Sequence, residues 1–358
     1  MRSFETFPEQ EEAKRLLRAA LAEGPAHAYL FYGPAGVGKR RAALAFAGEL
    51  VGDPERVARG AHPDVYLLEP LGDQIRIDPV RELRRDLHMR PFEAARRAYL
   101  VFGADLMNED AADALLKDLE EPPEYAHVVL VADELGPIPE TIRSRCQLVP
   151  FRRLSRGAVK AHLASRGLDG QALEIATRVA AGRLDRADRL LDADAGERRA
   201  AVLELARSAY ADATFDPAKA AGRVGELAHA RAAEARAQAE AAAIEGESAR
   251  DVEQRARRAE RGAERDEVLH TLDVLASWYR DLVVVGAGAP EAALNSDRLG
   301  ELAQDARPPV AVHAERAAEA VRDVWRSFEF NVQTGLALEA LFVRLRRELG
   351  GARGEAAP

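Results

Sequence analysis

The sequence predicts an α/β domain with a parallel sheet, followed by a small helical domain and a larger all-helical domain. Over the first 150 residues, short and continuously apolar runs alternate with helical patterns, which is typical of parallel strands covered on both faces. From about residue 154 these runs stop and only helical spacing continues. We expect the domains to span residues 1–154, 155–208 and 209–350, with a tail at 351–358.

Five strands are expected in the first domain. In chain order they are AYLFY (28–32), DVYLL (64–68), AYLVF (98–102), HVVLVA (127–132) and the weaker QLVPF (147–151). Helices between the strands are indicated by apolar side chains at helical spacing, for example Ala112, Leu115, Leu116 and Leu119. This alternation predicts a sheet flanked by helices.

The helical part of the chain divides into two kinds of segment. Residues 155–208 have the pattern of short helices, interrupted at Gly167, Gly170 and Gly182. Residues 217–267 are dominated by Ala, Arg and Glu and have almost no large apolar side chains. They predict a solvated helical arm or a partly mobile insertion. A coiled coil is the alternative, although a sustained heptad of large residues is missing.

Composition bounds the class of protein. The chain has 358 residues, of which 47% are hydrophobic and 31% charged, as in soluble folded proteins. No apolar run is long enough to predict a membrane span, and the acidic N-terminal stretch does not resemble a signal peptide. The single cysteine, Cys146, excludes an intramolecular disulfide and indicates a reducing, cytoplasmic environment. The net charge of −9 argues against non-specific binding of nucleic acid by the isolated chain.

A phosphate-binding loop is indicated between the first strand and the helix that follows it. Its residues are Gly33, Pro34, Ala35, Gly36, Val37, Gly38 and Lys39, followed by Arg40. The glycines let backbone N–H groups point inward, the helix N-terminus attracts anions, and Lys39 supplies a charge for phosphates. Arg40 stands where a Ser or Thr hydroxyl normally binds Mg²⁺. Two alternatives stay open: binding of ATP or ADP without turnover, and a turn that binds no nucleotide.

The acidic pair that would complete an ATPase site is missing. Such acids follow a later strand, where they hold Mg²⁺ and polarise the attacking water. At the end of the 98–102 strand this chain has Phe102 and Gly103. Asp105 comes too late in the chain and is expected to be the N-cap of the next helix. Hydrolysis of ATP by this chain is therefore not expected.

The combination of ALLKDLEEPP (114–123) with RSRCQ (143–147) resembles the clamp-loader branch of the AAA+ ATPases, and within it the non-motor subunit. Further stretches that resemble the family are HAYLFYGPAGVGK (27–39), HPDVYLLEP (62–70), IRIDPVRELRRDL (75–87), LASWYRDLVVV (275–285), LNSD (294–297) and NVQTGLALEALFVRLR (331–346). The resemblance implies an AAA+ P-loop domain, a small helical lid domain and a helical collar that serves oligomerisation. Residues 209–262 have no clear match.

The resemblance also implies a function. The chain would be a stator of the bacterial DNA polymerase III clamp loader, which helps to load the sliding clamp at primer–template junctions. Its partners would be gamma/tau and delta subunits in a hetero-pentameric ring, with the clamp and DNA contacted through the complex and no membrane. The expected location is the cytoplasm, with the replisome at the nucleoid. The chain would belong to a DNA polymerase holoenzyme without being catalytic alone.

Arg145 is the residue expected to contribute to catalysis. In the resembling family the arginine of a Ser-Arg-Cys motif, here Ser144, Arg145 and Cys146, acts in trans on the ATP of a neighbouring motor subunit. A guanidinium suits this task because it is always charged and can bond two phosphate oxygens. The alternative is a surface arginine paired with a nearby acid. Cys146 is expected to be a small buried core residue.

Departures from the family pattern refine these expectations. The stretch before His62 lacks the four cysteines of a zinc module, so we expect no zinc, no other metal and no required cofactor. Ala132 and Asp133 occupy the position of a polar nucleotide sensor, and Asp185, flanked by Arg183 and Arg186, aligns with a second sensor. Two other functions remain to be weighed: an active motor ATPase of the gamma/tau type, and a stand-alone P-loop kinase.

Overall fold

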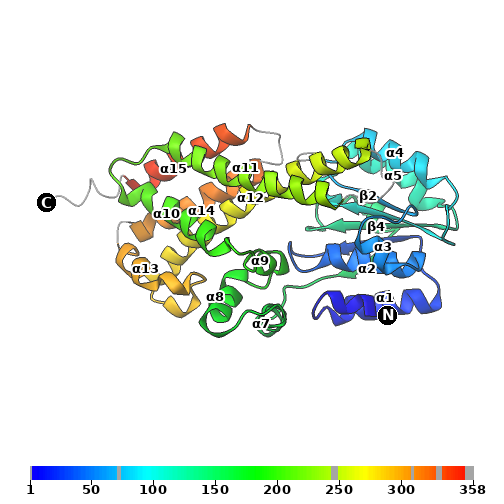
Figure 1. Ribbon diagram of the computed structural model, residues 1–358, viewed down its shortest axis with the longest axis horizontal. Helices are drawn as coiled ribbons and strands as arrows, with labels where there is room; N and C mark the ends of the chain where they lie inside the picture. The colour runs from blue at the N-terminus through cyan, green and yellow to red at the C-terminus, as the bar shows by residue number, and fades with distance from the viewer. Residues whose placement is uncertain (1, 71–73, 243–248, 308–309, 328–332, 351–358) are drawn as a thin grey trace. The chain divides into compact units, whose positions relative to one another are not determined.

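The computed structural model describes residues 2–70, 74–242, 249–307, 310–327 and 333–350 (Figure 1). The chain divides into two compact units, residues 1–191 and 192–358, which are described separately. The expected tail at 351–358 lies outside the described residues. Within the described ranges, no helix combines the length and the apolar character needed to cross a membrane.

The first unit contains a parallel five-stranded sheet. Its strands are β1 (Ala28–Tyr32), β2 (Val65–Leu68), β3 (Arg97–Phe102), β4 (Ala126–Ala132) and β5 (Gln147–Pro150). Their order across the sheet is β2-β3-β4-β1-β5, and each neighbouring pair is parallel. The five strands expected from the apolar runs are confirmed, and with them the predicted α/β class. Even the weaker run at 147–151 forms a strand, at the edge of the sheet beside β1.

Helices cover both faces of this sheet (Figure 1). They are α1 (Glu11–Glu23), α2 (Lys39–Val51), α3 (Pro54–Ala58), α4 (Ile77–Leu87), α5 (Glu109–Glu120) and α6 (Glu140–Arg143), with the short 3-10 helices η1 (Arg2–Thr6) and η2 (Ala104–Leu106). Because successive strand residues point to opposite faces, Tyr29 and Phe31 pack on the α1–α3 side and Leu30 on the α4–α5 side. The Tyr29 and Phe46 rings meet edge to face with centroids 4.9 Å apart.

Three further helices complete the first unit. They are α7 (Arg156–Ser165), α8 (Gly170–Ala180) and α9 (Leu184–Arg189). They share a small core of their own, in which Val159, Leu163 and Leu184 are buried. This group corresponds to the predicted small helical lid, and it ends with the first unit at Leu191.

The second unit is helical throughout its described residues. Its elements are α10 (Ala195–Ala211), α11 (Pro217–Ala241), α12 (Ala249–Gly286), η3 (Pro290–Ala292), η4 (Ser296–Arg298), α13 (Leu299–Asp305), α14 (Val310–Ser327) and α15 (Thr334–Gly350). Trp278 is fully buried in its core, and its indole N–H donates to the Tyr210 hydroxyl at 3.1 Å. Tyr210 in turn donates to Asp305 at 2.8 Å, so the polar tips of both rings are satisfied.

Two expectations about this helical region need correction. The lid was expected to continue to residue 208, but Val202 and Leu203 of α10 pack into the core of the second unit. The expected solvated arm at 217–267 is instead largely a helical hairpin, in which α11 packs along α12 and buries Ala220, Val224 and Ala228. Alanine side chains bury little area each, yet they let two helices approach closely. Residues 243–248 of that segment lie outside the described residues.

The buried carboxylate of Asp64 holds the loop that precedes β3. Asp64 is fully buried and accepts hydrogen bonds from the backbone N–H groups of Phe92 (2.7 Å), Glu93 (2.9 Å) and Ala94 (2.9 Å). Burial alone would raise the pKa of Asp64, but these three N–H donors and the nearby Arg97 guanidinium hold it below its usual value. The charged carboxylate therefore fixes the loop that leads into β3.

We expect Asp64→Asn to destabilise the first unit by about 2–4 kcal/mol, because one amide oxygen cannot replace a carboxylate that accepts three N–H bonds. Since the pKa is lowered on folding, this contribution is present above about pH 4 and is lost as the pH falls through the lower folded value. Urea unfolding at pH 7 and at pH 3 measures both effects. The exposed Asp78→Asn is the control and should cost less than about 1 kcal/mol. Equal losses in the two variants would contradict this account.

Candidate functional site

The predicted phosphate loop joins β1 to α2. Gly33, Gly36 and Gly38 have φ angles of 138°, 74° and 103°, values that other residues rarely adopt. A Cβ atom on Gly33 would lie 2.1 Å from the carbonyl oxygen of Phe151, just after the neighbouring strand β5. The glycines are thus required by the turn itself, whether or not a phosphate is bound.

Lys39 is engaged by groups of the protein. Its side chain is only 4% exposed. The ammonium group donates to the carbonyl oxygens of Gly33 (2.5 Å) and Pro34 (2.6 Å) and forms an ion pair with Asp133 at 2.8 Å. An ammonium group has three N–H donors, so these three oxygens satisfy it completely. In this arrangement Lys39 has no donor left for a phosphate.

Arg40 and Phe102, the two residues that depart from the pattern of a magnesium site, contact each other. The Arg40 guanidinium lies 4.2 Å from the centroid of the Phe102 ring, which is cation–π geometry. Its other contact is an ion pair with Glu69 at 2.5 Å. A hydroxyl and a carboxylate would occupy these two positions in a magnesium site. An arginine stacked on a phenylalanine supplies no metal ligand, so these residues do not fit a magnesium–nucleotide complex.

Asp105 does not have the role expected of it. The N-cap of α5 is Asn108, whose side chain accepts from the N–H of Ala111 at 3.0 Å. Asp105 instead accepts from the backbone N–H groups of Asp133 (3.0 Å) and Glu134 (3.1 Å), which follow β4. Burial, and then the charge of Asp133, raise its pKa. Asp105 therefore ties together the chain segments that leave two neighbouring strands.

The segment proposed as a second sensor lies directly on the phosphate loop. The backbone N–H of Leu184 donates to the carbonyl of Gly36 at 2.6 Å. Asp185 lies beside the same glycine and accepts from Arg183 Nε at 3.0 Å. The structure thus brings together the loop, Asp133 and the start of α9, although the sequence separates each of them from the next by about 50 to 100 residues. In the described parts of the chain, no three His, Cys, Asp or Glu side chains form a metal-binding group.

Arg145 lies at the amino end of β5, away from the ends of the strands that carry the phosphate loop. It donates to the carbonyl of Thr141 at 2.8 Å and forms an ion pair with Glu120 of α5. Its side chain is 34% exposed. The nearby acid expected for a surface arginine is therefore present. Arg145 and the phosphate loop, which sequence reasoning treated as parts of two different ATP sites, are not brought together.

Cys146 packs against the core on the α4–α5 side of the sheet and is partly buried. Burial raises the pKa of its thiol to about 12. A thiol with this pKa is almost entirely protonated at neutral pH, which suits a packing residue and not a nucleophile. Its neighbour Ser144 donates its hydroxyl proton to the carbonyl of Thr141 at 3.2 Å.

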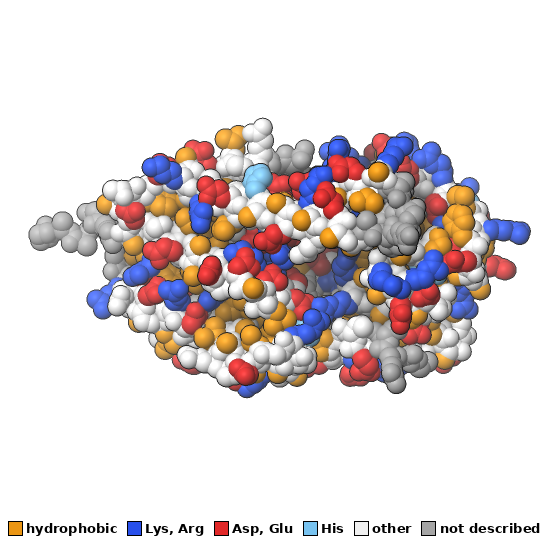
Figure 2. Space-filling view, in the orientation of Figure 1, with side chains coloured by type: hydrophobic (Ala, Val, Ile, Leu, Met, Phe, Trp, Pro, Cys, Tyr) orange, Lys and Arg blue, Asp and Glu red, His pale blue; other side chains and the backbone are white. Residues whose placement is uncertain are grey.

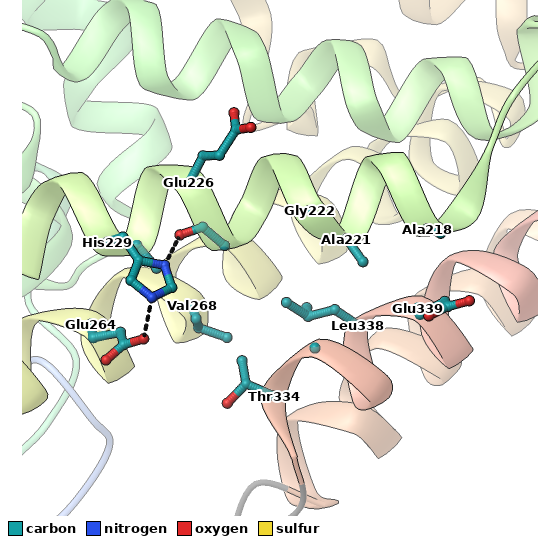
Figure 3. A pocket seen from close by; sticks show the side chains of 13 residues that line it. Ala218, Ala221, Gly222, Glu226, His229, Glu264, Val268, Thr334, Leu338 and Glu339 are labelled. Atoms are coloured by element: carbon teal, nitrogen blue, oxygen red, sulfur yellow. Dashed lines mark hydrogen bonds and ion pairs between the residues drawn. The ribbon is translucent and has the colours of Figure 1, made fainter.

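A groove in the second unit was missed by sequence reasoning (Figure 3). It has a volume of about 560 Å³ and lies among α11, α12 and α15. His229 lies at its margin, with Nδ1 2.7 Å from the carbonyl of Gly225 and Nε2 3.5 Å from Glu264. The signal in the sequence was weak: a stripe of small residues on α11 that includes Gly222 and Gly225.

The charged surface shows no single dominant sign on the face drawn in Figure 2. Lysine, arginine and acidic side chains are interspersed across that face. This distribution agrees with the net charge of −9 in giving no indication of a general nucleic-acid-binding surface there.

Comparison with known proteins finds relatives for part of the chain. A family model described as DNA polymerase III, delta subunit, matches residues 9–155, which include the loop, Phe102 and Arg145. DNA polymerase III subunit delta' of Bacillus subtilis is 36% identical over 149 residues, covering 38% of this chain and 45% of that protein. Residues 9–155 are thus similar to delta and delta' subunits of DNA polymerase III.

A subunit named tau is also similar to part of the chain. DNA polymerase III subunit tau of Bacillus subtilis is 31% identical over 186 residues, covering 48% of this chain and 33% of that protein. The chain thus spans less than half the length of either relative. A solved gamma subunit-related protein of DNA polymerase III from Thermotoga maritima superposes with a TM-score of 0.52 at 15% identity, covering 94% and 99% of the two chains. This similarity supports the fold alone.

Because Cys146 is the single cysteine, its burial can be measured directly. At pH 8, a pKa of about 12 leaves roughly 10⁻⁴ of the thiol as thiolate, compared with about 0.2 for an ordinary thiol. We expect a thiol-reactive disulfide reagent to label the native chain at least about 100-fold more slowly than the urea-unfolded chain. Equal labelling rates would show that the thiol is accessible and ordinary.

Proposed function

We propose that this chain is a non-motor subunit of the delta-prime type in the DNA polymerase III clamp loader. The observation that carries the proposal is the stacking of Arg40 on Phe102, which replaces both metal-binding positions of the chain's own ATP site. The proposed subunit acts as a stator: it requires no cofactor, and it holds its neighbours in position while they hydrolyse ATP. The similarity of residues 9–155 to delta and delta' subunits of DNA polymerase III supports this assignment.

The catalytic contribution proposed for the chain is the guanidinium of Arg145, presented to the ATP site of a neighbouring motor subunit. Arg145 lies on the surface, and its ion pair with Glu120 is half exposed, so a phosphate can replace the carboxylate at small cost. Ser144 and Cys146 flank it, the first bonded to the same α6 turn and the second packed on the core. They fix the backbone from which the arginine extends.

The proposed partners follow from this role. They are gamma/tau and delta subunits in a hetero-pentameric ring, with the sliding clamp and primer–template DNA reached through the complex. The second unit, with its continuous helical core, would form the collar that joins the subunits. The proposed place of action is the cytoplasm, with the replisome at the nucleoid.

An active motor ATPase of the gamma/tau type is the second candidate, because a tau subunit is 31% identical to part of the chain and because Lys39 is retained. The two candidates differ in turnover. We expect the purified chain to hydrolyse ATP, with Mg²⁺ present, at less than about 0.01 s⁻¹. A rate of order 1 s⁻¹ that depends on Mg²⁺ would contradict the stator proposal and favour the motor.

The role of Arg145 is tested in a reconstituted clamp loader. We expect Arg145→Ala to leave assembly of the complex intact and to lower the ATP hydrolysis stimulated by DNA and clamp at least about tenfold, because trans-acting arginines contribute roughly 10³–10⁵ at a single site. Arg145→Lys should recover little, since an ammonium group cannot bond two phosphate oxygens in a fixed plane.

Arg143→Ala is the matched control. Arg143 lies two residues away and forms an ion pair with Glu140 on α6, so its loss removes the same charge from the same stretch of chain. We expect its stimulated turnover to be close to that of the unmodified complex. Near-normal turnover with Arg145→Ala, or equal losses in the two variants, would refute the proposed role of Arg145.

A further inference from the structure

The side chain of Asp185 occupies space on the phosphate loop itself. A Cβ atom built on Gly36 would lie 1.9 Å from Asp185 Oδ1 and 2.5 Å from its carboxyl carbon. The carboxylate therefore lies directly against the α-carbon of the middle glycine of the loop. This contact joins a residue of the lid to the backbone that would otherwise surround a phosphate.

The carboxylate is held there as an anion. Arg183 donates to it through Nε at 3.0 Å and through Nη2 at 2.5 Å, and the backbone N–H of Arg186 donates at 2.9 Å. Burial opposes ionisation, but Arg183 more than compensates and lowers the pKa of Asp185. An anion and its guanidinium partner thus lie against Gly36 of the loop.

The contact is part of a wider closure of the lid over the loop. The Gly36 carbonyl accepts from the Leu184 N–H at 2.6 Å, and a Cβ on Gly38 would lie 3.3 Å from the Leu184 side chain. Asp188, one turn further along α9, pairs with Arg41 of α2 and with His162 of α7 at 2.7 Å. The first turn of α9 is therefore joined to the loop by its backbone and by an apolar side chain, and Asp188 joins α9 to α2 and α7 by ion pairs.

We propose that Asp185, packed against Gly36, closes the phosphate loop against nucleoside triphosphates. The carboxylate competes with phosphate for the same stretch of backbone, and nucleotide binds only when the segment 183–188 moves away. The proposal concerns the chain's own loop and does not depend on the role of Arg145. Its failure would leave the proposed stator function untouched.

The proposal predicts a measurable affinity change. When only an open fraction of the molecules can bind, the apparent dissociation constant rises in inverse proportion to that fraction. Asp185→Ala removes the carboxylate that lies against Gly36 and, with it, the ion pair that orders Arg183 in the same segment. The open fraction should then rise, and the affinity for nucleotide should rise with it.

The experiment titrates the full-length chain with a fluorescent N-methylanthraniloyl ATP, without Mg²⁺ because no metal ligands are present at positions 40 and 102. We expect Asp185→Ala to bind at least about tenfold more tightly than the unmodified chain, and Asp185→Asn to lie between them. The matched control is Glu174→Ala, which removes a lid carboxylate from the exposed ion pair with Lys160. It should bind as the unmodified chain does.

A second measurement tests the contact without any ligand. Gly36→Ala should lower the melting temperature strongly in the unmodified chain, because its methyl group collides with Asp185. In the Asp185→Ala background the collision with Asp185 is gone, and the strain of a positive φ and the contact with Arg183 Nε at 2.8 Å remain, so the loss should be smaller. Hydrogen exchange over residues 183–190 should be faster in Asp185→Ala, which shows that the segment has opened.

Three outcomes would overturn the proposal. The first is nucleotide binding by the unmodified chain that is as tight as that of Asp185→Ala. The second is faster exchange in the variant with no gain in affinity, which would mean that closure is not what prevents binding. The third is an equal effect of Gly36→Ala in both backgrounds, which would show that the contact does not exist in solution.

Discussion

The common direction of the five strands governs where every candidate group of the first unit can lie. Residues that follow the strands gather at the carboxyl ends of the strands, here called the first edge of the sheet. Residues that precede the strands gather at their amino ends, the other edge. Lys39, Phe102 and Asp133 belong to the first edge, whereas Arg145 precedes β5. Tyr29 pairs with Gln147, the first residue of β5. The loop starts four residues after Tyr29, and at roughly 3.3 Å for each residue of a strand this is a distance of ~13 Å along β1. Arg145 therefore cannot serve the chain's own phosphate loop.

At the first edge, substitutions that look independent in the sequence form one packed unit. A cation at position 40 would repel a divalent metal, and without an acid after β3 no metal is held there in any case. Phe102 gives the Arg40 guanidinium an aromatic face, and Glu69 neutralises its charge. Each replacement is stabilised by the other groups, so restoring one residue alone would leave an unpaired partner. The loss of metal-binding chemistry is thus part of how this edge of the sheet is packed.

Much of the fold could be predicted because buried parallel strands are continuously apolar, a signal that is local in the sequence. The site was predictable only in part. Asp105 looked like an N-cap, but its bonds to residues after β4 are long-range contacts, which no local pattern reveals. The packing of α11 escaped notice because the helix buries alanines, and an argument based on large apolar side chains does not count them. The contact of Asp185 with Gly36 likewise depends on the placement of α9, which the sequence does not determine locally.

The cations of the first unit differ in how readily they can exchange partners. Lys39 is 4% exposed and bonded to two carbonyls and Asp133, so moving it would break three polar contacts of a buried ammonium group at once. The side chains of Arg145 and Glu120 are 34% and 48% exposed, and an ion pair of that kind contributes only about 0–1 kcal/mol. A phosphate offers a guanidinium two charge-assisted hydrogen bonds, which is more than the pair provides. Of these two cations, the one that can bind phosphate at little cost therefore lies at the edge of the sheet away from the phosphate loop.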